Sequence, residues 1–236
     1  MAHDGHESIS GLFSGEAGTL ATSAAGSIAR EDTEKRLTKV NWRDFSEPTV
    51  APLLQTALTE FVKQGYHGTS IRALALGAGM SVAGLYHHYP SKQDILVQIM
   101  ELAMEDLFHR STGALAEAGD SIEDQFRLHI ECLVLFHAYR SDLAFVAANE
   151  IRALAPEARL RHIEARDRQQ AILWAIVTAG VEEGLFDAQF PRESTRAIVT
   201  MCTGVAQWYR FGGSLTPEQL ADRYVTIAAS TVGEKR

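Results

Sequence analysis

Residues 65–96 read GYHGTSIRALALGAGMSVAGLYHHYPSKQDIL, and the organisation of the whole chain follows from them. The stretch holds two short helical patterns separated by a tight turn at Ala78-Gly79-Met80. Each pattern begins after a hydroxyl residue that can cap a helix, namely Thr69 or Ser70 for the first and Ser81 for the second. The second pattern is too short for a core helix and carries small and polar residues where it should face outward. We therefore predict a helix-turn-helix whose second helix fits the major groove of DNA.

The alternative interpretation of this stretch is a pair of short core helices, and four features argue against it. Gly79 occupies the turn, where a residue that tolerates a left-handed conformation is needed. Residues 82–84, Val-Ala-Gly, are small enough to approach a groove closely. Residues 86–88, Tyr-His-His, can donate hydrogen bonds to phosphates, and Lys92 adds a positive charge. The hydroxyl residue before the first helix places a helix N-terminus where it can bind an anion.

Residues 68–96 resemble the signature of the TetR family of bacterial transcription regulators. In that family these motifs form helices two to four of an all-α homodimer that binds DNA. The resemblance assigns phosphate contacts to the second helix, base contacts to the edge of the recognition helix, and backbone contacts to the residues after that edge. The DNA-binding residues that it implies are Thr69, Ser70, Arg72, Ser81, Val82, Ala83, Gly84, Tyr86, His87 and Lys92.

The chain departs from the family pattern just before the first helix. There the family often carries a basic cluster, whereas this chain has Phe45-Ser46-Glu47-Pro48. A charged run at residues 30–36 precedes this position, and we interpret it as a solvated arm. The alternative is a basic arm that touches DNA through Arg36, Lys39 and Arg43, which the interleaved acids disfavour.

The composition of the chain limits its class. It has 236 residues, of which 46% are hydrophobic, enough for one sizeable core and a small appended domain. The net charge of -8 and the pI of about 5.6 require that any DNA contact be local and aimed by the fold. We interpret Cys132 and Cys202 as reduced core residues of a cytoplasmic protein, since they cannot build a disulfide framework. The chain shows neither a run of about 18 apolar residues nor a secretory signal, so we expect no membrane partner.

Three regions follow from the patterning. Residues 1–46 are poor in large apolar residues and are predicted to be a disordered extension. Residues 47–92 are predicted to form the DNA-binding domain, with a first helix from Pro48 to Gly65. Residues 93–236 are predicted to form a helical ligand-binding and dimerisation domain, entered by a long helix that begins at a capping box at Ser91. No strand alternation is present, so we predict an all-α fold with further helices at 71–78, 82–88, 121–139, 142–153, 156–183, 191–209 and from a second capping box at 216–219.

The second half of the chain is where we expect a ligand, because apolar helices with a few embedded polar groups form pockets. Plain core packing is the alternative for each aromatic candidate. Four arginines of one helix, residues 159, 161, 166 and 168, could recognise an anion such as a coenzyme phosphate. The alternative is an ordinary helix face paired with the acids at 157, 164 and 167. The candidate ligand-binding residues are Phe136, His137, Phe145, Glu150, Arg152, Trp174 and Trp208.

About a third of the chain carries a second and less specific resemblance. Residues 163–170 (IEARDRQQ), Trp174, residues 180–186 (GVEEGLF) and residues 207–224 (QWYRFGGSLTPEQLADRY) look like one subgroup of the same family. That subgroup includes regulators of fatty-acid and steroid catabolism that respond to acyl-CoA thioesters. The resemblance therefore implies a small-molecule effector, for which an acyl-CoA is the candidate.

Dimerisation is expected from the last helices, because they offer more apolar surface than one small core needs. In the family, the two penultimate long helices form a four-helix interface between two copies. A two-fold dimer would place two recognition helices one DNA turn apart, about 34–36 Å, on a pseudo-palindrome. The residues expected to supply the surface are Ile198, Met201, Cys202, Val205, Trp208, Ala171, Trp174, Ala175 and Thr178.

Catalysis and metal binding are not supported by any motif. The chain has no nucleophile elbow, phosphate loop or HExxH sequence, so we predict no enzymatic activity and no cofactor. His87 and His88 are adjacent on a helix and point about 100° apart, so they do not easily bind one ion.

The sequence thus predicts a ligand-responsive repressor that binds a palindromic operator as a homodimer and is released by a small effector. Three alternatives stay open. The first is a regulator of the same fold that senses drugs or other hydrophobic ligands. The second is an activator that uses the same motif. The third, which the acidic net charge supports, is a ligand-binding helical protein or small enzyme with a vestigial front domain.

Overall fold

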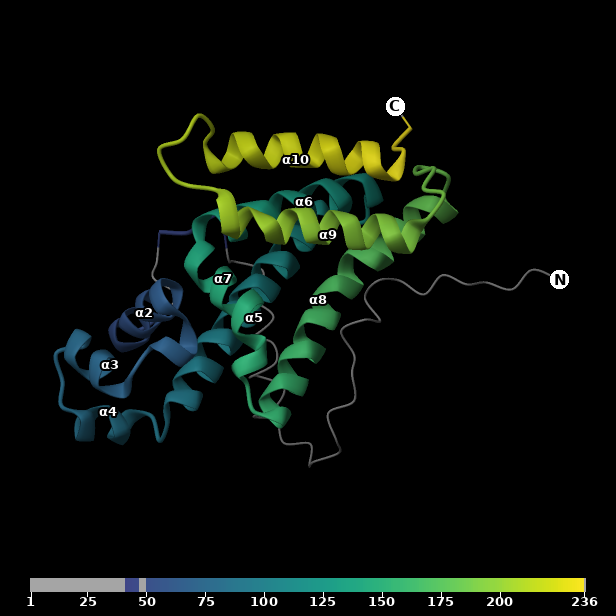
Figure 1. The fold of residues 1–236 in the computed structure, drawn as a ribbon. Coiled ribbons are helices and arrows are strands. Elements are labelled where there is room, and N and C mark those ends of the chain that lie inside the picture. Colours follow the sequence, from purple (N-terminus) through teal and green to yellow (C-terminus); the bar gives the residue numbers. More distant parts are fainter. Residues whose placement is uncertain (1–40, 47–49, 236) are drawn as a thin grey trace, which may run out of the picture. The chain divides into compact units, whose positions relative to one another are not determined.

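The computed structural model describes residues 41–46 and 50–235. This part of the chain contains nine α-helices, one short 3-10 helix and no strand, which confirms the predicted all-α fold (Figure 1). None of its helices combines the length and the apolar character needed to span a membrane. The elements are α2 (Pro52–Gly68), α3 (Ile71–Gly77), α4 (Val82–His88), α5 (Lys92–Ala118), α6 (Ile122–Tyr139), α7 (Ser141–Asn149), η2 (Glu150–Ala153), α8 (Pro156–Glu182), α9 (Pro191–Trp208) and α10 (Pro217–Val232).

Helix α2 differs from its predicted bounds at both ends. Pro48, the predicted start, lies outside the described residues, and α2 begins at Pro52 after the extended residue Ala51. Proline suits this position because the first turn has no helical hydrogen bond for it to remove. Gly65 leaves the helical conformation with a φ of 74°, as expected for a helix end, but a further turn continues to Gly68.

Side-chain caps set the starts of the later helices where the sequence predicts them. Ser70 and Ser81 each accept a hydrogen bond from the backbone N–H three residues later, at 3.1 and 3.0 Å. Thr216 and Gln219 form a complete capping box, in which each side chain bonds the backbone N–H of the other residue. These contacts are local in sequence, which explains why the helix starts can be located without the tertiary structure.

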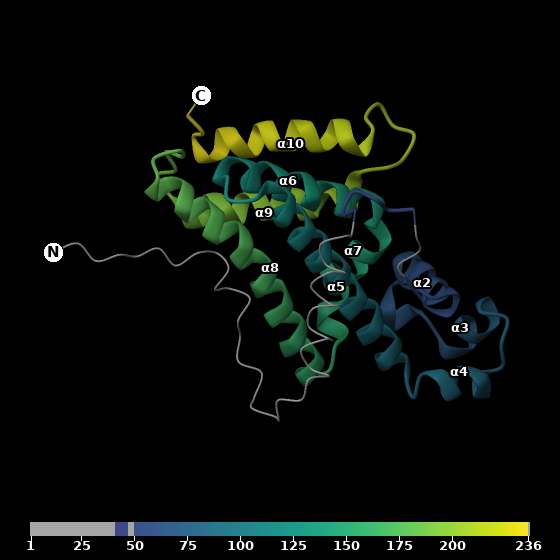
Figure 2. The same cartoon turned by 180° about the vertical axis from the view of Figure 1, so that it is seen from behind.

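A first hydrophobic cluster holds α2, α3 and α4 against the first half of α5. It continues into α7 and the start of α8 through Leu143, Val146 and Ala158. Helix α5 therefore runs from the helix-turn-helix to the remaining helices, as both views show (Figures 1 and 2). The predicted domain boundary after residue 92 therefore falls within one continuous hydrophobic cluster.

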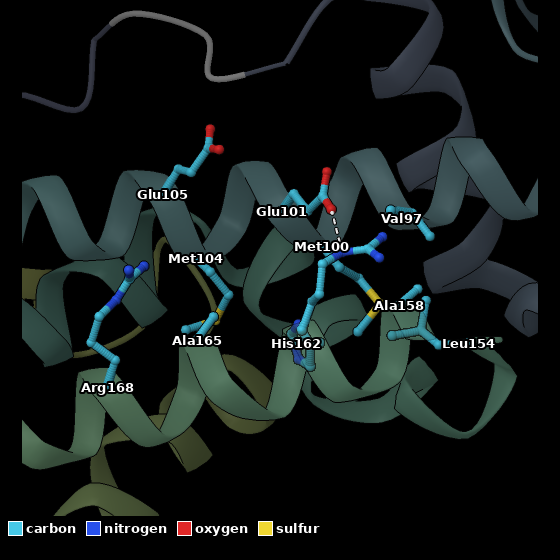
Figure 3. Close-up of a pocket in the computed structure, with 11 residues that line it drawn as sticks. Val97, Met100, Glu101, Met104, Glu105, Leu154, Ala158, His162, Ala165 and Arg168 are labelled. Atoms are coloured by element: carbon cyan, nitrogen blue, oxygen red, sulfur yellow. Dashed lines mark ion pairs between the residues drawn. The ribbon is translucent and has the colours of Figure 1, made fainter. Parts of the chain in front are cut away.

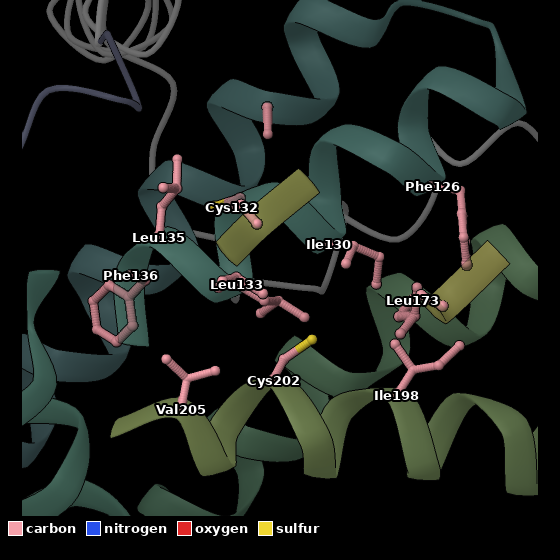
Figure 4. Close-up of a cluster of buried hydrophobic side chains, with 14 of the residues drawn as sticks. Phe126, Ile130, Cys132, Leu133, Leu135, Phe136, Leu173, Ile198, Cys202 and Val205 are labelled. Atoms are coloured by element: carbon pink, nitrogen blue, oxygen red, sulfur yellow. The ribbon is translucent and has the colours of Figure 1, made fainter. Parts of the chain in front are cut away.

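A second hydrophobic cluster surrounds α6 and takes side chains from α5, α8, α9 and α10. Ile198, Cys202 and Val205 of α9 are fully buried and point toward α6 (Figure 4). This corrects the prediction that these three residues supply a dimer surface. Periodicity shows that one face of α9 is apolar, but it does not show which partner covers that face. Trp208 at the end of α9 lies outside this buried face and is exposed.

Residues 41–46 pack on α5 and α6, which corrects the prediction of disorder for this part of the N-terminal extension. The side chain of Trp42 is 2% exposed, and its indole N–H donates to Glu117 Oε2 at 2.7 Å. The guanidinium of Arg110, on α5, donates to the carbonyl oxygen of Trp42 at 2.7 Å. The rest of the predicted extension, residues 1–40, lies outside the described residues.

Candidate nucleic-acid interface and effector cavity

Helices α3 and α4 form a helix-turn-helix. Gly79, in the turn, has a φ of 68°, a left-handed conformation that favours glycine. Leu74 and Ala75 of α3 and Leu85 of α4 are buried in the first hydrophobic cluster. Because these inner faces are packed against α2 and α5, the outer face of α4 is presented to solvent.

The outer edge of α4 carries most of the predicted base-contacting side chains. Ser81, Val82 and Ala83 are exposed. Gly84 is half-buried, and a Cβ there would lie 3.3 Å from the Ser81 hydroxyl, so a small residue also suits the helix cap. This edge can therefore approach a groove without a large side chain in the way.

The predicted phosphate-contacting side chains divide into exposed and buried ones. Ser70, Arg72 and His87 are exposed, and the ring of Tyr86 is 46% exposed. Thr69 is only 1% exposed, and its hydroxyl donates to the carbonyl oxygen of Gly65 at 2.9 Å. The predicted role of Thr69 as a phosphate contact is therefore corrected. Its hydroxyl instead stabilises the connection between α2 and α3.

Lys92 is also engaged within the protein. Its ammonium group donates to the carbonyl oxygens of Tyr66 and Thr69, at 2.7 and 2.8 Å, and lies 4.1 Å from the centre of the Tyr66 ring. Burial lowers the pKa of this ammonium group. Its hydrogen bonds serve the end of α2, so Lys92 contributes only its positive charge toward a phosphate in this conformation.

The helix-turn-helix has a charge pattern that the whole-chain charge conceals. No acidic residue occurs between Glu60 and Asp94, whereas the same interval contains Lys63, Arg72 and Lys92. The net charge of the chain is -8, so its acids are concentrated elsewhere. This acid-free interval coincides with α3, α4 and their flanks, and it makes the exposed face of α4 suitable for a polyanion.

Arg43, one member of the alternative basic arm, is paired with acids of α5 and α6. Its guanidinium donates to Glu131 Oε1 at 2.6 Å and to both carboxylate oxygens of Glu117 at 2.8 Å. These carboxylates raise the pKa of Arg43 above its usual value. Arg36 and Lys39 lie outside the described residues.

A cavity of about 360 Å³ lies among α5, α6, α7, α8 and α9. Small and apolar side chains from α5, α6 and α7 line one part of it, and polar side chains from α8 and α9 line another. Of the seven predicted ligand-binding residues, Phe136 and His137 line this cavity. The full lining is Ala103, Met104, Leu107, Leu133, Phe136, His137, Ala144, Ala147, Ala148, His162, Arg166, Asp167, Gln169, Gln170, Arg196, Val199, Thr200 and Thr203.

The other five predicted ligand-binding residues do not line this cavity. Phe145 packs against the first hydrophobic cluster, and Arg152 is exposed on η2. The carboxylate of Glu150 accepts a hydrogen bond of 3.2 Å from the backbone N–H of Tyr66. Trp174 and Trp208 are 40% and 53% exposed. Aromatic and charged residues in the second half of the chain were therefore poor guides to the cavity, because they serve cores and surfaces as well.

A second cavity of about 190 Å³ lies between α5 and α8 (Figure 3). It shares Met104 and His162 with the larger cavity, so the two are adjacent. Glu101 and Arg161 form an ion pair of 3.7 Å across it. Of the four arginines considered as anion ligands, Arg161 and Arg168 line this cavity and Arg166 lines the larger one, whereas Arg159 lines neither.

Two important lining residues, His162 and Gln169, were missed from the sequence. They are seven residues apart and therefore lie on one face of α8, in line with the buried residue Ile176. A polar residue that interrupts an apolar stripe of a helix is a signal in the sequence for a cavity-lining position, and both residues interrupt such a stripe on α8.

The buried histidines that line the larger cavity are held in their neutral forms. Burial lowers the pKa of His137 to about 4 and also lowers the pKa of His162. Burial raises the pKa of the nearby thiol of Cys132 to about 12, so this cysteine is not a thiolate nucleophile. Among the described residues, no three His, Cys, Asp or Glu side chains are grouped to hold a metal ion.

Two family models match the chain. Residues 53–99, which include the helix-turn-helix, match the model described as bacterial regulatory proteins, tetR family. Residues 119–232, which include most of the cavity-lining helices, match the model described as tetracyclin repressor-like, C-terminal domain.

Individual relatives match over most of their length. The HTH-type transcriptional repressor KstR2 of Rhodococcus jostii is 30% identical over 181 residues, which cover 74% of this chain and 86% of the relative. The solved structure of the TetR family transcriptional regulator PfmR from Thermus thermophilus is 31% identical, with a TM-score of 0.70 over 78% of this chain and 99% of that one. The structure of AibR in complex with isovaleryl coenzyme A and operator DNA is 25% identical, with a TM-score of 0.67 over 78% of this chain and 97% of that one.

Proposed function

Because the chain belongs to the tetR family of bacterial regulatory proteins, we propose that it is a transcriptional repressor that binds a palindromic operator as a homodimer and is released by a small effector. The observation that carries this proposal is the acid-free, exposed helix-turn-helix on an otherwise acidic chain. The KstR2 relatives are named as transcriptional repressors, which supports the choice of repressor over activator.

The proposed DNA contacts follow from exposure. Ser70 and Arg72 lie at the start of α3 and are proposed to bind phosphates, as are Tyr86 and His87 at the end of α4. The α4 edge at residues 81–84 is proposed to face the base edges in the major groove. Phosphate contacts set affinity for any sequence, whereas the α4 edge sets the choice of sequence.

Dimerisation is proposed through the exposed faces of α8 and α9. Trp174 and Trp208 are large apolar side chains that no described part of the chain covers fully. Ala171 and Ala175 of α8 and Gly204 of α9 are small and half-buried, which allows two helices to cross closely. A two-fold axis through this surface would pair two α4 helices for half-sites about 34–36 Å apart.

The cavity is proposed to bind the effector, with an acyl-CoA thioester as the candidate class. Its apolar wall suits an acyl chain, and Arg166 and Arg196 supply positive charge for an anionic group. The relative AibR has been solved with isovaleryl coenzyme A and operator DNA, which supports the class. A ligand releases DNA only if it binds the two conformations with different affinity. Helix α5 is suited to carry that difference, since it lines the cavity through Ala103, Met104 and Leu107 and begins beside the helix-turn-helix.

A mobility-shift assay on DNA upstream of the gene, with and without acyl-CoAs of several chain lengths, tests the proposal. Tyr86→Ala should weaken binding roughly 10- to 150-fold across all sequences, since a hydrogen bond to a charged phosphate contributes about 1.5–3 kcal/mol. Tyr86→Phe is the matched control that isolates the hydroxyl, and Ala83→Ser should change sequence preference. Binding to no genomic fragment would remove the proposed function, and DNA binding that every acyl-CoA leaves unchanged would remove the effector class.

A further inference from the structure

The buried polar side chains of the larger cavity share one chemical property. His137, His162 and Gln169 line it, and each is at least nine-tenths buried. Each also uses a donor group to bond a protein atom. Each side chain therefore keeps a hydrogen-bond acceptor, and Gln169 also keeps a second amide N–H.

The two histidines show this through their backbone partners. His137 Nδ1 lies 2.6 Å from the carbonyl oxygen of Leu133, and His162 Nε2 lies 3.0 Å from that of Ala147. A carbonyl oxygen only accepts, so each of these ring nitrogens carries the hydrogen. Burial keeps both rings neutral, so the second nitrogen of each ring is an acceptor.

Gln169 supplies the third acceptor. Its amide nitrogen donates to the hydroxyl of Ser111 at 2.6 Å, and Ser111 is fully buried and does not line the cavity. The Gln169 side chain is therefore held by a residue of the protein core. Gln169 Oε1 is buried and has no hydrogen-bond partner within the described part of the chain. A buried polar atom of this kind is costly to leave unpaired.

We propose that the effector carries a hydroxyl group on its apolar part and that this hydroxyl is bound by Gln169, with His137 and His162 as flanking acceptors. The inference rests on the proposed function and narrows its effector class to hydroxylated chains or rings. A ketone, ester or carboxylate at the same place would bring an acceptor against the two histidine acceptors, whereas a hydroxyl can donate to them. A hydroxyl both donates and accepts, so it also pairs with Gln169 if the amide is rotated to present its nitrogen. The arginines Arg166 and Arg196 remain available for the anionic end of the same molecule.

The test compares three CoA thioesters that differ only at the end of the chain: saturated, terminally hydroxylated, and carrying a ketone one carbon from the end. Each is made in a hexanoyl and a decanoyl series, so that chain length does not decide the result. Dissociation constants of the full chain are measured by isothermal titration calorimetry. The hydroxylated probe should bind roughly threefold to tenfold more tightly than the saturated one in at least one series, and the ketone should bind no more tightly than the saturated one.

Gln169→Met and Gln169→Leu should abolish the hydroxyl preference while they retain binding of the saturated probe. Two substitutions are used so that a packing defect in one does not decide the outcome, and circular dichroism checks that each variant keeps its helices. Equal or weaker binding of the hydroxylated probe in both series overturns the inference, as does a preference that survives both substitutions. If the saturated probes bind and the hydroxylated probes bind no more tightly, only this inference is overturned. If no probe binds, the proposed effector class is removed as well.

Discussion

Lys92 donates a hydrogen bond of 2.8 Å to the carbonyl oxygen of Thr69, which joins the start of α5 to the connection between α2 and α3. A second hydrogen bond of 2.7 Å reaches the carbonyl oxygen of Tyr66. An ammonium group is well suited to carbonyls at a helix end, where the backbone acceptors have no helical partner. Helix α5 also lines the cavity through Met104. The same helix is therefore hydrogen-bonded to the α2–α3 connection at its start and contacts the cavity further along.

Lys92→Met should therefore lower the free energy of unfolding by about 1–3 kcal/mol, because two hydrogen bonds from a charged donor are lost. Operator affinity should fall as a consequence. Lys63→Met removes an exposed lysine from α2 and is the matched control, with an expected change within about 0.5 kcal/mol. Urea unfolding and a mobility-shift assay measure the two effects. Unchanged stability with weakened DNA binding would instead favour Lys92 as a direct phosphate contact.

The segment at residues 41–46, which precedes the helix-turn-helix, is attached to α5 and α6. The indole of Trp42 packs against Gly113 of α5, where an added Cβ would lie 3.1 Å from Trp42 Cβ. Phe45 stacks on Tyr139 of α6 with ring centres 4.7 Å apart, and the guanidinium of Arg110 lies 3.7 Å from the Phe45 ring centre. The segment is thus fixed by apolar burial as well as by ion pairs.

Trp42→Ala should destabilise the protein by about 3–5 kcal/mol, as expected when a large buried aromatic side chain is deleted. Arg43→Ala should cost only about 1 kcal/mol or less, because the ion pairs of Arg43 are partly exposed to solvent. The ordering of these two losses tests whether burial or charge fixes the segment. Denaturant midpoints at low and high salt measure it, and a larger loss for Arg43→Ala than for Trp42→Ala would contradict the expectation.

Helix positions could be predicted because their signals are local. Ser81 caps α4 through a residue three positions away, and the apolar periodicity of α6 depends only on its own sequence. The helix-turn-helix face could be predicted for the same reason, since a family motif is a local pattern.

The partners of individual side chains could not be predicted, because they depend on tertiary packing. Trp42 is an isolated aromatic residue in a polar stretch, and its burial against Gly113 joins positions 71 residues apart. Ile198 and Trp208 both looked like surface for a partner copy, yet only Trp208 is exposed. Thr69 carries the hydroxyl that a phosphate contact needs, but its backbone position turns that hydroxyl toward Gly65.

Trp174→Glu combined with Trp208→Glu should convert the proposed dimer to a monomer, since two charges would be buried without partners in the contact. Operator affinity should then fall by at least roughly tenfold, because one half-site is lost. Ile227→Glu, on α10, is the matched control, since it also replaces an exposed apolar side chain but lies outside the proposed surface. Sedimentation velocity measures the assembly state. A double variant that remains dimeric would place the interface elsewhere.

Acid should destabilise the protein through its buried histidines, and His129 offers the clearest case. His129 is fully buried, neither ring nitrogen has a hydrogen-bond partner within the described residues, and burial lowers its pKa to about 4. In the unfolded chain its pKa is about 6.5. Between those values the unfolded state binds a proton that the folded state does not, so stability falls as the pH drops from about 6.5 to about 4.

The loss attributable to His129 should reach roughly 3 kcal/mol at the acid end of this range. His129→Leu should remove that part of the loss and leave stability at pH 7 equal or higher, because an unpaired polar ring is replaced by an apolar side chain of similar size. Urea unfolding of both proteins at several pH values measures the difference between them, so that titrating carboxylates cancel. A difference that does not change between pH 7 and pH 4.5 would show that His129 is not held neutral in the folded protein.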